Sequence, residues 1–107
     1  MDNIDFGDIE KQIGDLAKTL LRGFVNQAKQ DGQQFLEDSK DTFITLTKQL
    51  KDGEIRKTNY ENSLINLAAL AKMERLKQMG LAQVAIDKFT NGVIDILITA
   101  GTKAIRL

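Results

Sequence analysis

Side chains that can act as a nucleophile, a general base or a metal ligand are scarce in this sequence. It contains no histidine and no cysteine, so the residues that most often fill these roles are missing. The Glu-x-x-His motif of di-iron helical bundles is therefore impossible, and no glycine-rich loop follows a strand to bind phosphate. We predict no catalytic residue, no metal ion and no cofactor, and hence a protein that is not an enzyme.

The densest group of carboxylates consists of Glu37, Asp38 and Asp41. At helical spacing these side chains lie mostly away from Phe35 and Leu46, so we interpret them as a solvated helix face rather than a metal site.

Tyr60 is the only tyrosine, and we expect it to be a packing residue with a hydrated hydroxyl rather than a catalytic acid. If the chain folds back at residue 53, Gly14 and Gly92 lie opposite each other. That pairing indicates either a close helix contact or hinge, or glycines that are merely tolerated in a helix.

Fifteen basic and fifteen acidic residues cancel over the whole chain of 107 residues, but not locally. Residues 1–53 carry a net charge of −3, and residues 54–107 carry a net charge of +3. A neutral chain without a concentrated basic face is a poor candidate for nucleic-acid binding. The asymmetry favours pairing of the two halves with each other, the alternative being a charged partner. It also predicts that Asp8 and Lys103 are neighbours.

Apolar residues in the first half recur every three or four positions, as on one face of a helix. A repeat of eleven residues links Ile13, Phe24, Phe35 and Leu46, and this period keeps an apolar stripe nearly straight. It predicts one helix from about residue 6 to 51, about 70 Å long. The alternative is a break at Gly32, because Asp31-Gly32 is a turn signal.

Asp52-Gly53 falls at the middle of the chain, where Gly53 follows a helical run and fits a left-handed helix cap. This segment resembles the helix–Gly-x-Ile–helix turn of the short C-terminal (SHOCT) family, with Gly53, Ile55 and Tyr60 at matching positions over some twenty-five residues. It departs from that family at Arg56, where the pattern has Thr or Ser. The resemblance implies a helical hairpin and no particular function.

The second half is apolar on most sides of its helices, in residues 64–73 and again in residues 93–98. A helix of this kind needs more than one neighbour, which predicts a homodimer. Gly80 either breaks this half into two helices or is tolerated within one. The expected core includes Phe24, Phe35, Leu46, Leu67 and Leu70. The expected interface between copies consists of Leu64, Leu67, Leu70, Met73, Ile94 and Ile98.

These patterns predict a single all-α domain over residues 1–107. The preferred fold is an antiparallel, coiled-coil-like long helical hairpin that turns at Gly53 and dimerises into a four-helix bundle. The alternative is a monomeric four-helix bundle broken at Gly32, Gly53 and Gly80.

The function expected from this architecture is that of a non-enzymatic interaction or scaffold module, which acts through self-association or a helical protein partner. The alternative is reversible adsorption to a lipid or apolar surface, although no Trp and no flanking row of basic residues support membrane binding. The acidic start lacks the basic region of a signal peptide, and the apolar stretch 89–105 is short and charged. We therefore expect a cytoplasmic protein, the alternative being export by a dedicated signal-independent system.

Overall fold

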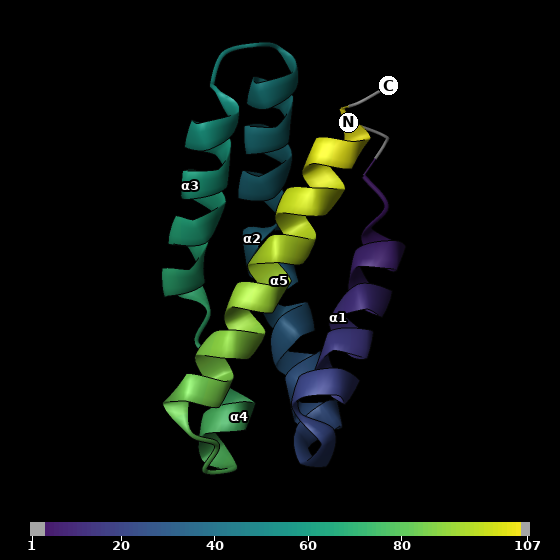
Figure 1. Cartoon of the computed structure of the whole chain (residues 1–107), viewed down its shortest axis with the longest axis vertical. Helices are drawn as coiled ribbons and strands as arrows, with labels where there is room; N and C mark the ends of the chain where they lie inside the picture. The colour runs from purple at the N-terminus through teal and green to yellow at the C-terminus, as the bar shows by residue number, and fades with distance from the viewer. Residues whose placement is uncertain (1–3, 106–107) are drawn as a thin grey trace.

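The computed structural model describes residues 4–105, and the regular elements in that range are all helical (Figure 1). This confirms the all-α prediction, including helix for the β-branched stretch 93–99. The elements are α1 (Phe6–Leu20), the 3₁₀ turn η1 (Arg22–Phe24), α2 (Val25–Lys51), α3 (Lys57–Leu67), the 3₁₀ turn η2 (Ala68–Leu70), α4 (Glu74–Gln78) and α5 (Gln83–Ala104).

Four of the helices run alternately down and up the long axis of the molecule, in the order α1, α2, α3 and α5 (Figure 1). α1 packs against α2 and α5, α3 packs against the same two helices, and the short α4 packs mainly against α2. The 27 residues of α2, about 40 Å at helical rise, span nearly the whole 43 Å length of the molecule. The helices of one chain therefore pack around a shared apolar core.

The expected single helix over residues 6–51 is wrong, because the chain turns at residues 21–24. Leu21 and Phe24 leave the helical conformation, with φ near −132° and −134°. The turn is held by the amide of Leu21 bonding to the carbonyl of Ala17 and by that of Phe24 bonding to the carbonyl of Leu21, each at 2.8 Å. Leu21 is buried at the turn. An apolar residue at position 21 fits a continuous apolar stripe and a buried corner equally well, so the sequence pattern did not predict the break.

The alternative break at Gly32 is also wrong, because Gly32 lies inside α2. A Cβ at this position would come within 2.5 Å of the Ile13 side chain and 3.4 Å of the Phe89 ring. Gly32 therefore allows α1 and α5 to approach α2 closely, and its absent side chain serves packing rather than a turn.

Glycine ends both α2 and α4, as expected at Gly53 and as one of the two alternatives left open at Gly80. Both residues have a left-handed backbone, with φ of 77° and 78°. Beyond α2, the amide of Glu54 donates to the carbonyl of Gln49 at 2.9 Å and that of Gly53 to Leu50 at 3.2 Å, which is a Schellman motif. The same pattern of two bonds follows α4, so these two turns are set by local chemistry.

The core holds large side chains from all four long helices, including Ile9, Ile13, Phe43, Tyr60, Leu64, Phe89 and Leu97. Of the expected core residues, Phe35 and Leu67 are buried, while Phe24 and Leu46 are half-buried. Leu70 is exposed, so its assignment to the core was wrong. The reason is that α3 ends at Leu67 and continues as a 3₁₀ turn, which rotates Leu70 out of the helical register.

Candidate functional site

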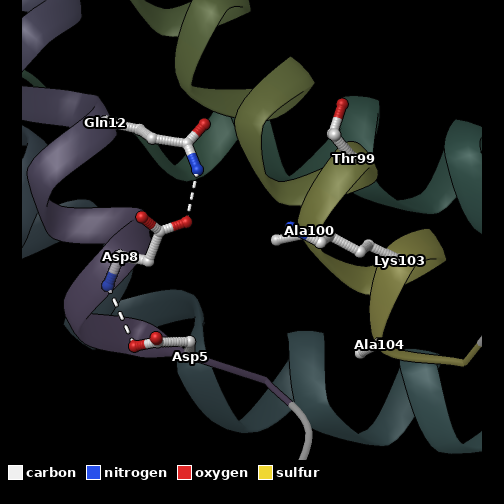
Figure 2. Close-up of a pocket in the computed structure, with 7 residues that line it drawn as sticks. All are labelled: Asp5, Asp8, Gln12, Thr99, Ala100, Lys103 and Ala104. Atoms are coloured by element: carbon white, nitrogen blue, oxygen red, sulfur yellow. Dashed lines mark hydrogen bonds between the residues drawn. The ribbon is translucent and has the colours of Figure 1, made fainter.

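A polar groove of about 630 Å³ lies between the start of α1 and the end of α5 (Figure 2). On the α1 side, Asp5 Oδ1 accepts the amide of Asp8 at 3.0 Å, and Asp8 Oδ2 accepts the Gln12 side-chain amide at 2.7 Å. On the other side, the side chain of Lys103 extends from α5 toward α1 (Figure 2). Asp8 and Lys103 line the same groove from facing helices, and their predicted contact within a side chain's reach stays a prediction.

The polar groups of this groove serve the fold. Asp5 caps α1, and its negative charge and that of Asp8 suit the positive end of the helix. Lys103 lies in the last turn of α5, where a cation is favourable. These charges are exposed, so each favours its own helix end only weakly. Over residues 4–105, no group of three acidic side chains is arranged to hold a metal ion.

Asp31 is a buried carboxylate that was expected from the sequence only as a turn signal. Its Oδ2 accepts the amide of Leu76 at 2.9 Å, and its Oδ1 accepts the amide and the guanidinium of Arg75 at 3.2 and 3.3 Å. α4 begins after Met73, which has a left-handed backbone and makes no side-chain cap. Asp31 therefore supplies from α2 the cap that α4 lacks. The sequence feature that could have indicated this role is an acidic residue at the centre of an apolar stripe.

Tyr60 is fully buried between α2, α3 and α5, so the expectation of a hydrated hydroxyl was wrong. Its Oη lies 2.7 Å from the hydroxyl of Thr47, which also donates to the carbonyl of Phe43 at 2.8 Å. Burial raises the pKa of the Tyr60 phenol, and the hydrogen bond with Thr47 offsets part of that rise. The backbone of Gly101 lies directly against the phenol oxygen. The arrangement is a packed polar contact with no access to a substrate.

The residues expected at an interface between copies differ in burial. Leu64, Leu67, Met73 and Ile94 are buried in the core of the single chain, while Ile98 is half-buried and Leu70 is exposed. The interface stays a prediction. In this fold only Leu70 and Ile98 of the predicted set present surface to a second copy.

An apolar groove of about 320 Å³ lies where α1 ends and α5 begins. It is lined by Leu20, Leu21, Ala82, Val84, Ala85 and Lys88. Leu20 and Val84 expose 42% and 69% of their surface, far more than large aliphatic side chains usually do. Lys88 is exposed, and its side chain makes no hydrogen bond or ion pair with another described residue. We call this surface the apolar groove.

Two further apolar side chains near the end of α3, Ile65 and Leu70, are 52% and 57% exposed. Leu70 lines a recess against α2 and α4 together with Asp31 and Arg75, whereas Glu61, one turn before Ile65, lines a recess against α5 together with Lys103. The exposed side chains around α3 therefore do not form one continuous surface. The exposure of Leu20 and Ile65 was not expected, because Leu20 fits the apolar stripe of the first half and Ile65 lies in the apolar segment 64–73.

Comparisons with family models, with curated proteins and with solved structures find no match for this chain. The resemblance of the Gly53 turn to the SHOCT family therefore rests on the three matching residues alone. Among the described residues, no helix combines the length and the apolar character needed to cross a lipid bilayer.

Proposed function

We propose that the protein is a non-enzymatic helical interaction module that acts through self-association. The observation that carries the proposal is the separation of its apolar side chains into two populations. One population forms a core that is complete within a single chain. The other is exposed, at Leu20 and Val84 in the apolar groove and at Ile65, Leu70 and Met79 elsewhere, and the core makes no use of it.

Exposed apolar side chains that gather rather than scatter are typical of protein–protein contact sites. Leu20 and Val84 come from opposite halves of the chain yet line one groove. The apolar groove is small compared with a standard stable interface, so the association is expected to be weak and concentration-dependent.

Molar mass measured by light scattering over a range of concentrations tests this function. We expect the mean mass to equal the chain mass of 11.9 kDa in dilute solution and to rise at several hundred micromolar. The variant Val84→Lys should reduce the rise, whereas Thr45→Lys, at an exposed position of α2, should leave it unchanged. A mass that stays at 11.9 kDa throughout would refute self-association.

A further inference from the structure

We infer that residues 71–81, which contain α4, open as a unit while the four long helices stay folded. We call this segment the α4 strap. It connects η2 to the start of α5 at one end of the molecule (Figure 1). The inference concerns a single chain, so it is independent of the proposed self-association.

The α4 strap contributes little to the core. Only Met73 and Leu76 of its 11 residues are buried, whereas α2 and α5 bury 8 residues each. α1 and α3 pack directly against α2 and α5, so the four long helices keep these contacts when the strap is displaced. Segments with few buried apolar side chains are the ones that open locally in folded proteins.

The backbone is left-handed on both sides of α4. Met73 precedes α4 with φ of 47° and ψ of 47°, and Gly80 follows it with φ of 78°. Among the described residues, Met73 is the one non-glycine residue with a positive φ. This conformation is unfavourable for a residue with a Cβ. Opening lets Met73 return to an ordinary conformation, so the strain favours the open state.

Asp31 holds the α4 strap against α2 through three hydrogen bonds. Its carboxylate accepts the amides of Arg75 and Leu76 at 3.2 and 2.9 Å and the Arg75 guanidinium at 3.3 Å. This carboxylate is 3% exposed in the closed fold. In the open state water binds the carboxylate and both amides, so the net loss of hydrogen bonding on opening is small. The three bonds therefore determine where the strap docks without preventing its release.

Opening exposes apolar surface that the closed fold hides. Leu76 is fully buried and Met73 is 3% exposed, and α4 packs against α2 and α5. Displacing the strap uncovers these two side chains and the parts of α2 and α5 beneath them. Met79, which lies in the same strap, is already 50% exposed. The two methionines therefore differ in whether a reagent in solution can reach them before the strap opens.

Hydrogen exchange of two matched glycine variants, followed by NMR, tests the inference. A Cβ at Gly80 or at Gly53 meets no other atom within 4 Å, and the two residues have φ of 78° and 77°. Alanine therefore strains both turns to a similar extent. The readout is the protection of the amides of Leu76, bonded to Asp31, and Leu81, bonded to the carbonyl of Leu76.

In the unaltered protein, we expect both amides to be at least about tenfold less protected than the slowest amides of α2 and α5. Gly80→Ala should lower their protection by about 5–30-fold, because only the closed strap is strained. Gly53→Ala should leave their protection unchanged, because the turn at Gly53 stays folded when the strap opens. It should still lower the protection of the slowest amides of α2 and α5, which exchange when the whole chain unfolds. If Gly53→Ala lowers the protection of Leu76 and Leu81 as much as Gly80→Ala does, the strap opens only on complete unfolding and the inference is wrong.

Methionine oxidation by hydrogen peroxide gives a second readout, in which the sulfur gains one oxygen atom and the peroxide leaves as water. Met73 should react more slowly than Met79, because it reacts only after opening. Asp31→Asn should speed the oxidation of Met73 by about fivefold and leave Met79 unchanged. Asp41→Asn, which alters an exposed carboxylate of the same helix, should change neither rate. Peptide mapping by mass spectrometry measures both, and a Met73 rate that does not respond to Asp31→Asn would overturn the role of Asp31 in holding the strap.

Discussion

The carboxylate of Asp31 in α2 accepts the backbone amide of Leu76 at 2.9 Å, across a separation of 45 residues. This bond joins the start of α4 to the longest helix. A helix of five residues is too short to be stable alone, and α4 has no cap in its own sequence. The position of α4 therefore depends on a side chain from the other half of the chain.

Replacing Asp31 by alanine should lower the free energy of unfolding by about 2 kcal/mol, because the amides of Arg75 and Leu76 lose their acceptor. Asp31→Asn keeps one acceptor oxygen and should cost about half as much. Asp38→Ala, which removes an exposed carboxylate from the same helix, should stay within about 0.5 kcal/mol. Urea denaturation measures all three, and equal midpoints for Asp31→Ala and Asp38→Ala would contradict the capping role.

Two helical glycines should respond oppositely to alanine. A Cβ at Gly101 would overlap the hydroxyl of Tyr60 and crowd the Phe43 ring, so Gly101→Ala should destabilise the fold by about 1–3 kcal/mol. A Cβ at Gly14 would meet only the flexible side chain of Lys29, at 3.5 Å. Gly14→Ala should therefore be neutral or stabilising by up to about 1 kcal/mol. Melting temperatures that fall equally for both variants would contradict this difference.

Two leucines near the end of α3 differ in burial and should differ in their contribution to stability. Leu64 is fully buried and Leu70 is exposed. Leu64→Ala should cost about 3 kcal/mol of unfolding free energy, while Leu70→Ala should change it by less than about 0.5 kcal/mol. Urea midpoints provide the comparison. A large loss in the second variant would mean that Leu70 packs against the core.

Tyr60 should make the protein less stable at high pH. Because burial raises its folded-state pKa above the ordinary value of 10.0, the unfolded chain loses the phenol proton first. The free energy of unfolding should therefore fall as the pH rises above about 10 toward the folded-state pKa. The variant Tyr60→Phe should show a smaller fall over the same range, because the buried ring then carries no phenol to lose a proton. Identical pH profiles for the two proteins would rule out a buried phenol.

The features that local chemistry determines could be predicted from the sequence. Gly53 ends a helix because its turn needs a left-handed residue, and the few residues around it are enough to predict this. At Gly80, similar local signals left both a break and a continuous helix open. The all-helical composition was predictable from periodicity.

The features that tertiary packing determines were not predictable. Leu21 fits an unbroken stripe and a buried corner equally well, and Gly32 resembles a helix breaker until Ile13 and Phe89 are placed against it. Asp31 interrupts the apolar pattern, and its role depends on Leu76 reaching it from the other half of the chain. The apolar groove was missed because the sequence alone does not show which apolar residues stay outside the core.

The most direct test of self-association through the apolar groove is to record amide spectra of isotope-labelled protein by NMR as its concentration is raised. We predict that signals of residues 20–21 and 82–88, around the apolar groove, shift or broaden. The outward face of α2 around Thr42 and Thr45 should be unaffected. Spectra that do not change with concentration, or changes confined to α2, would contradict the claim that the copies associate through this groove.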